Sequence, residues 1–208
     1  MTVLIAIDQG TTSTRTVAYD KDLNIIHSEQ KEYPLLYPND GWVEIEPKEL
    51  MNSVYTTIDP VIDICPDIVA AGITNQRETT LIWDADSGIP IYNAIVWQDR
   101  RTADQCMQLK QAGYEEAIKN KTGLLLDPYF SSTKISWILD NVDGARAKAE
   151  AGKLRFGTVD TYLLWQLSKG DIFKTDVTNA SRTNLYNIHS KNWDDELLEI
   201  FKVPASML

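Results

Sequence analysis

Apolar positions in the first part of the chain predict short strands joined by polar turns. Residues 3–8 form the apolar run "VLIAID", residues 16–20 read "TVAYD", and residues 25–33 read "IIHSEQKEY". Apolar runs separated by turn residues in this way are typical of a β-meander. The nearly unbroken apolar character of the first run predicts a strand buried on both faces, in the middle of a sheet.

Helical spacing of apolar residues becomes dominant later in the chain. Residues 47–63 open with a proline in the first turn and predict a helix, and residues 67–74, "DIVAAGIT", predict a buried strand. Two further strand candidates lie on either side of the turn "DADSG". This order, with strands first and helices dominant afterwards, predicts an α/β domain whose helices pack on a mixed sheet. The later helices are predicted at residues 100–113, 132–142, 145–152, 159–170 and, after the Asp pair of "NWDDELLEIF", near the C-terminus.

Composition and charge narrow the classes of partner. The chain has 208 residues, of which 43% are hydrophobic and 24% charged, so it can bury one sizeable core, and one compact domain is expected. Thirty acidic and twenty basic residues give a net charge of −10, which disfavours nucleic acid and anionic membrane surfaces as partners. No signal peptide or membrane-spanning stretch is evident, so a cytoplasmic location is expected. Cys65 and Cys106 lack CxxC spacing and are predicted to be buried free thiols.

The turn "DQGTTSTR", between the first two predicted strands, is a candidate phosphate site. Gly10 allows the chain to approach a ligand closely or to take a positive φ, and Arg15 supplies a cation. Backbone amides and hydroxyls in such a turn form a concave anion site, although the turn is not a Walker loop. Asp8, at the end of a buried strand, is suited to face phosphates across Mg²⁺. An ordinary polar hairpin is the alternative. The hydroxyl residues of the turn are Thr11, Thr12, Ser13 and Thr14.

Seven segments in order carry a family resemblance along nearly the whole chain. They are "IDQGTTSTR", "GWVEIEP", "GITNQRETT", "IYNAIVWQDRR", "TGLLLDPYFSSTK", "FGTVDTYLLW" and "TNASRT". Together they resemble the FGGY carbohydrate kinase family, and within it the members that phosphorylate glycerol. The resemblance implies an actin-like ATPase, ribonuclease H-like fold. It also implies that residues 1–208 are the N-terminal, substrate- and phosphate-binding domain, cut before its C-terminal end and without the second, ATP-binding domain.

The resemblance also assigns roles to individual residues. Arg77 and Glu78 match positions that bind glycerol hydroxyls, the Arg donating and the Glu accepting. Because neighbours in a regular strand point to opposite faces, the backbone must leave strand geometry near Gln76 for both to reach one substrate. Trp97 and Tyr129 match positions where an indole covers the carbon edge of glycerol and a phenol hydroxyl binds it. The resemblance assigns Gly10, Thr11, Thr12, Ser13 and Arg15 to the phosphates of ATP and Asp8 to Mg²⁺.

Simpler structural explanations exist for each of these residues. Arg77 and Glu78 would otherwise be an exposed ion pair at a strand end, and Trp97 and Tyr129 would be core residues. Core packing is the interpretation preferred for Trp42, Trp83, Trp137, Trp165 and Trp193. The polar side chains of residues 178–183, "TNASRT", are expected to hold a loop near the cleft.

The implied reaction is transfer of the γ-phosphoryl group of ATP to the 3-hydroxyl of glycerol, which gives ADP and sn-glycerol 3-phosphate. No catalytic residue is expected in this chain, because the family's general base is an Asp in a "GDQ"-like motif beyond residue 208. The chain alone is therefore expected to be inactive, and its full-length parent is expected to form a dimer or tetramer. The alternatives are an FGGY kinase for xylulose or gluconate, a non-catalytic nucleotide-binding module of the actin and chaperone superfamily, and a bare interaction module.

Overall fold

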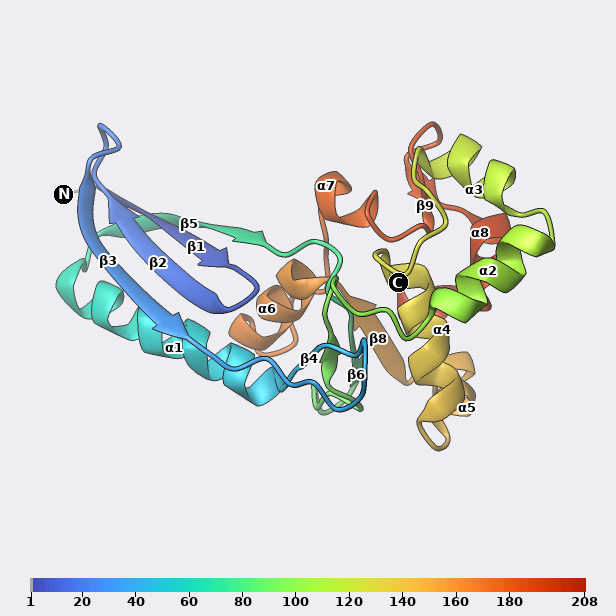
Figure 1. The fold of residues 1–208 in the computed structure, drawn as a ribbon. Helices are drawn as coiled ribbons and strands as arrows, with labels where there is room; N and C mark the ends of the chain where they lie inside the picture. Colours follow the sequence, from blue (N-terminus) through green and yellow to red (C-terminus); the bar gives the residue numbers. More distant parts are fainter. Residues whose placement is uncertain (1) are drawn as a thin grey trace. The chain divides into compact units, whose positions relative to one another are not determined.

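The structure, a computed structural model, describes residues 2–208 and divides them between two compact units (Figure 1). The first unit contains the chain up to Leu36 together with Ile45–Gln76. The second contains Tyr37–Glu44 and Arg77–Leu208. The length of the chain led us to expect one compact body, whereas its internal contacts separate it into these two.

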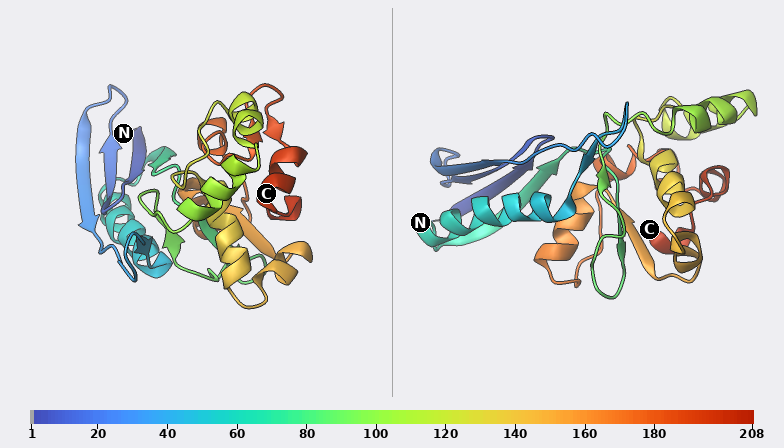
Figure 2. Two further views of the ribbon diagram at one scale, coloured as in Figure 1. Left: turned by 45° about the vertical axis from the view of Figure 1, so that its right-hand side comes forward. Right: turned by 60° about the horizontal axis from the view of Figure 1, so that its bottom comes forward.

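The first unit is a four-stranded mixed sheet with one long helix. The strands β1 (Val3–Gln9), β2 (Ser13–Tyr19), β3 (Ile25–Glu32) and β5 (Ile68–Asn75) lie in the order β3-β2-β1-β5. β1 pairs antiparallel with β2 and parallel with β5. Helix α1 (Pro47–Ile64) runs along one face of this sheet (Figures 1 and 2). The predicted meander, the mixed sheet and the central place of the first strand are confirmed.

Alternation along β1 decides which side chains face α1. Val3, Ile5 and Ile7 are buried in a small apolar cluster with Val61 and Cys65 at the end of the helix. Two buried hydroxyl pairs join α1 to β2. One links Thr14 to Ser53 at 2.7 Å, and the other links Thr16 to Thr57 at 2.9 Å. Each hydroxyl therefore has a partner, so it does not carry the cost of an unpaired buried polar group.

Two predictions of strand burial are wrong. The alternate residues of β1 on the face away from α1 are only partly buried, and Asp8 among them is exposed. β5 is largely exposed, with Val69 64% accessible. The physical reason is that α1 covers one face of the sheet and that β5, at its edge, pairs on one side only with β1. Apolar composition cannot distinguish such an edge strand from a buried one.

The second unit is built around β6 (Leu81–Asp84) and β8 (Leu154–Gly157), which pair antiparallel. Its core includes Ile82 of β6, Ile135 and Ile138 of α4, and Phe156 of β8. The helices are α2 (Ala103–Gln111), α3 (Glu115–Thr122), α4 (Ser131–Asn141), α5 (Ala145–Glu150), α6 (Val159–Leu167), α7 (Val177–Ala180), α8 (Asp195–Phe201) and the 3₁₀ turn η1 (Ala205–Met207). The remaining short strands are β4 (Glu44–Ile45), β7 (Ala94–Ile95), β9 (Tyr186–Asn187) and β10 (Asn192–Trp193).

Most of the predicted helices are present within one to three residues of their expected limits. The helix at the Asp pair is confirmed as α8, where the Asp194 carboxylate accepts from the amide of Leu197 at 3.2 Å. Helices α3 and α7 and strand β8 had not been predicted, because each is short and carries few periodic apolar positions. Both cysteines are buried free thiols, as predicted. Within residues 2–208, no helix is both long and apolar enough to cross a membrane.

A buried charge cluster anchors the second unit. The Arg101 side chain is fully buried and pairs with Asp99 at 2.8 Å and with Glu44 at 2.7 Å. Its guanidinium carbon lies 3.8 Å from the ring centroid of Trp42 and 4.5 Å from that of Trp137. Burial alone would lower the pKa of Arg101, but the bonds to Asp99 and Glu44 raise it above its ordinary value. Trp42 and Trp137 thus pack as structural residues, against a cation as well as against each other at 5.1 Å.

Candidate functional site

The turn between β1 and β2 closes tightly at the candidate phosphate site. The amide of Gly10 donates to the carbonyl of Ser13 at 2.9 Å, and Gln9 pairs with Thr14 in the ladder. The φ of Gly10 lies outside the left-handed region, but a Cβ there would lie 3.2 Å from the Ser13 carbonyl oxygen. A positive φ is therefore not the reason for this glycine, and the close contact that it permits here is with the backbone of Ser13.

Three side chains hold the carbonyl of Gly10. Gln9 Nε2 donates to it at 2.7 Å, Gln76 Nε2 at 3.1 Å, and the hydroxyl of Tyr33 donates as well. Burial raises the pKa of the Tyr33 phenol, so this group stays a protonated donor. Since the Gly10–Thr11 peptide is trans, its N–H points away from these three donors. The backbone of the turn is thereby fixed in one orientation.

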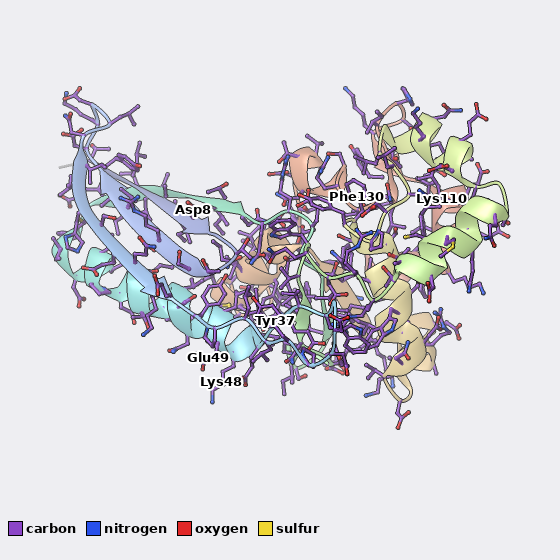
Figure 3. All side chains as sticks on the ribbon, in the orientation of Figure 1. Asp8, Tyr37, Lys48, Glu49, Lys110 and Phe130 are labelled. Carbon is purple, nitrogen blue, oxygen red and sulfur yellow. The ribbon has the colours of Figure 1, made fainter. Side chains whose placement is uncertain are left out.

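Asp8 and Arg15 face each other across the β1–β2 ladder. They are direct cross-strand partners, and both are exposed. Directly opposite residues in an antiparallel pair share one face of the sheet, and Figure 3 labels Asp8 on the side away from α1. Arg15 Nε also donates to Ser28 Oγ at 3.0 Å. A carboxylate and a cation thus stand side by side next to the turn.

The donor set around Asp8 fits Mg²⁺ that arrives with phosphates. Residues 2–208 contain no group of three His, Cys, Asp or Glu side chains that could hold a metal by themselves. Mg²⁺ in nucleotide sites uses one or two carboxylates together with phosphate oxygens and water. A single exposed carboxylate beside an anion-binding turn meets that requirement.

The chain leaves strand geometry where the substrate assignment required it. β5 ends at Asn75, Gln76 is not in a strand, and Arg77 and Glu78 lie in a turn. This confirms the prediction for the backbone near Gln76. The two neighbouring side chains differ in environment, because Arg77 is exposed whereas Glu78 is only 5% accessible.

Glu78 pairs with a distant arginine. Arg182 Nε lies 2.6 Å from Glu78 Oε1, and among the described residues no carboxylate forms an ion pair with Arg77. The guanidinium of Arg182 also lies 5.0 Å from the ring centroid of Phe130 and 5.8 Å from that of Tyr129. The alternative of an exposed Arg77–Glu78 pair is therefore wrong. Arg182 belongs to the "TNASRT" segment. The sequence analysis expected this segment only to hold a loop, and did not predict that one of its residues pairs with Glu78.

Trp97 and Tyr129 come together from two separate loops. Their ring centroids are 5.5 Å apart at an angle of 55°, and both side chains are half-buried. The amide of Tyr129 donates to Asp127 Oδ1 at 2.9 Å, which fixes its turn. Arg182 links Tyr129 to Glu78, so the structure brings three of the predicted glycerol ligands into one cluster, and Arg77 adjoins them through the chain. We refer to Arg77, Glu78, Trp97 and Tyr129 as the patch.

A buried lysine supports the patch from below. Lys134 Nζ donates to the carbonyl of Glu78 at 3.0 Å and to the carbonyl of Tyr129 at 2.8 Å. Its side chain is fully buried, and burial lowers its pKa to about 7. Sequence reasoning missed this residue, although its spacing from Ile138 on the same helix places both on the core-facing side.

One cavity in the second unit lies apart from the patch, since none of the four patch residues lines it. It encloses about 250 Å³ and is lined by residues that include Phe156, Thr158, Phe173, Trp193 and Leu208. None of its lining residues was predicted as a site residue. The patch itself is a cluster of side chains on turns.

Comparison with known proteins gives consistent matches along nearly the whole chain. Residues 3–208 match the sequence profile described as "FGGY family of carbohydrate kinases, N-terminal domain". A glycerol kinase of Haemophilus influenzae is 56% identical over 209 residues, which cover 99% of this chain and 42% of that protein. The chain thus spans less than half the length of the relatives it matches.

Solved structures give the same family and fold. A Plasmodium falciparum glycerol kinase with ADP matches with a TM-score of 0.91 and 38% identity over 97% of this chain and 41% of that one. A ligand-bound xylulose kinase from Lactobacillus acidophilus matches with a TM-score of 0.88 and 26% identity over 100% of this chain and 41% of that one. The expected actin-like, ribonuclease H-like architecture is confirmed by these matches.

Proposed function

Because this chain belongs to the FGGY family of carbohydrate kinases, we propose that it forms the glycerol- and phosphate-binding part of a glycerol kinase. The complete enzyme transfers the γ-phosphoryl group of ATP to the 3-hydroxyl of glycerol. The observation that carries this proposal is the 56% identity to a glycerol kinase over 99% of the chain. The geometry of the turn and of the patch supports the assignment of individual roles.

In this proposal the β1–β2 turn binds the phosphates of the nucleotide. Its fixed backbone amides and the hydroxyls of Thr11, Thr12 and Ser13 hold phosphate oxygens, and Arg15 balances their charge. Asp8 would hold Mg²⁺, and the ion would neutralise charge on the phosphates. Phosphoryl transfer depends mainly on such positioning and charge neutralisation.

In the same proposal the patch binds glycerol. Arg77, exposed and without a carboxylate partner among the described residues, donates to one hydroxyl, and the carboxylate of Glu78 accepts from another. Arg182 Nε donates to Oε1 of Glu78 at 2.6 Å, which holds the carboxylate in one orientation. The indole of Trp97 covers the carbon edge of glycerol, and the hydroxyl of Tyr129 binds a third polar position.

Phosphoryl transfer also needs a group that accepts the proton of the attacking hydroxyl. We assign no residue among 1–208 to that role, and we expect no turnover by these residues alone. A positioned base commonly contributes 10²- to 10⁴-fold, roughly, to such a reaction. The test measures ADP release from MgATP with and without glycerol. It compares the 208-residue chain with a chimera in which residues 1–208 replace the matching part of the Haemophilus influenzae glycerol kinase.

The expected result is glycerol-dependent ADP release by the chimera alone. Arg77→Ala and Glu78→Gln each lose a hydrogen bond to a charged group, so each should raise the glycerol KM about 10- to 100-fold. If the chimera prefers xylulose or gluconate, that sugar and not glycerol is the substrate. Turnover by the 208-residue chain would show that it contains its own base.

The xylulose and gluconate alternatives, and that of a non-catalytic nucleotide-binding module, receive less support. Identity falls to 26% for the xylulose kinase structure, against 56% for the glycerol kinase sequence. A nucleotide-binding module or a bare interaction module has no use for the patch. We further propose a cytoplasmic, homo-oligomeric enzyme that does not bind nucleic acid, in keeping with the net charge of −10.

A further inference from the structure

Two loops that are far apart in the sequence meet at one amino group. The turn that follows β5 contributes the carbonyl of Glu78, and the loop before α4 contributes the carbonyl of Tyr129. Both accept from Lys134 Nζ, at 3.0 and 2.8 Å. The side chains of the same two residues form part of the patch. Lys134 therefore ties together the backbone at two of the four positions proposed to bind glycerol.

The burial of this lysine has a cost that packing alone does not explain. A lysine normally extends its amino group to water, and moving that group into an apolar interior is unfavourable unless it is paired. Lys134 is fully buried in the first turn of α4, where the helix dipole adds a further unfavourable interaction with a cation. A methionine would fill a similar volume without this cost. Compared with a methionine, the amino group of Lys134 adds the hydrogen bonds to the two carbonyls.

The charged groups around Lys134 are arranged on several elements. Asp99 and Glu78 favour its charged form, as does Asp127, whereas Arg101 opposes it. The hydrogen bonds of Nζ go to backbone carbonyls of the two loops and not to a carboxylate. Ammonium and neutral amine each have at least two N–H donors, so either form can hold both carbonyls.

We propose that Lys134 is a positioning residue for the patch, which sets the separation of Glu78 and Tyr129 by holding their backbone carbonyls on one nitrogen. This inference rests on the proposed function, since the ligand of the patch is taken to be glycerol. Lys134 itself lies beneath the patch and does not touch the substrate. Its loss should weaken glycerol binding and loosen both loops, and should leave the nucleotide side unchanged.

The test compares Lys134→Met with the matched control Ile138→Ala. Ile138 is equally buried, lies one turn further along α4 and makes no bond to either loop. Hydrogen–deuterium exchange of the 208-residue chain is followed in peptides covering residues 76–80 and 127–131. In the chimera, KM for glycerol and KM for MgATP are measured separately. If Lys134→Met does not fold, Lys134→Gln replaces it, because its shorter side chain cannot reach both carbonyls.

The expected outcome is faster exchange in both peptides of Lys134→Met, with a glycerol KM raised about 10-fold or more and an unchanged KM for MgATP. The Ile138→Ala control should lose thermal stability without these changes. If both peptides exchange in Lys134→Met at the same rate as in the parent chain, the inference is overturned, whatever the substrate. If the chimera with intact Lys134 shows no glycerol-dependent ADP release, the proposed function is contradicted. The exchange result would still decide the role of Lys134.

Discussion

Replacing Arg101 by methionine should be among the most destabilising single changes in the second unit. The guanidinium is enclosed by Trp42 and Trp137 and neutralises Asp99 and Glu44. Methionine keeps much of the packing volume but leaves two buried carboxylates without their cation. Removing one partner of a buried ion pair commonly costs about 3–5 kcal/mol, because the remaining charge stays desolvated.

The neighbouring residue Arg100 provides a control for the predicted loss of stability. Arg100 pairs with Asp127 at 2.8 Å, but its side chain is 54% accessible, so Arg100→Met should cost at most about 1 kcal/mol. For a chain of this size, 1 kcal/mol corresponds to about 2–4 °C in Tm, so Arg101→Met should lower Tm by roughly 6–20 °C. Arg101→Lys should fall between the two, since an ammonium cannot reproduce the bonds of the guanidinium fork.

Urea unfolding, followed by tryptophan fluorescence and circular dichroism, measures these free energies. Equal stability of Arg101→Met and Arg100→Met at neutral pH would refute the reasoning. It would mean that the carboxylates find water or other donors when the guanidinium is lost.

Three further predictions concern the site. Arg182→Gln should raise the glycerol KM of the chimera about 10- to 100-fold, while Arg146→Gln, which removes a surface pair with Asp140, should not; equal effects would remove Arg182 from the site. Asp8→Asn should raise the Mg²⁺ concentration needed for half-maximal turnover without changing the glycerol KM, and an unchanged Mg²⁺ titration would contradict the assignment. The pH dependence of stability should reveal Lys134. Its folded pKa of about 7 lies below the ordinary lysine value of 10.5, so between about pH 7 and about pH 10.5 the unfolded state binds more protons. The parent should therefore gain up to about 1.4 kcal/mol per pH unit relative to Lys134→Met, and parallel stability profiles would contradict this.

Local features of the structure followed well from the sequence. The helices with several periodic apolar residues and the strand order at the start of the chain depend on nearby residues. For that reason α1, with Pro47 in its first turn, was predicted nearly to its limits. The break near Gln76, in contrast, was predicted through the roles that the family resemblance gives to Arg77 and Glu78. The candidate ligands of the patch were also named from the sequence, but only through a family resemblance, because nothing local distinguishes Trp97 from the other tryptophans.

Features that depend on distant partners could not be predicted in the same way. Glu78 pairs with Arg182, 104 positions further along the chain, and this partner was not predicted. The two carbonyls held by Lys134 belong to different loops. The exposure of β5 depends on which elements cover it rather than on its own composition. In each case the decisive interaction is tertiary, and periodicity within one element carries no information about it.

The three donors on the carbonyl of Gly10 have a consequence for the kinetics and thermodynamics of phosphate binding. Gln9, Tyr33 and Gln76 fix this peptide when the protein folds, so a phosphate meets a backbone that is already ordered. Little conformational entropy is then lost on association, and no slow rearrangement of the turn has to precede it. Nucleotide phosphates should accordingly bind this turn in a single fast step, at a rate limited by diffusion and orientation.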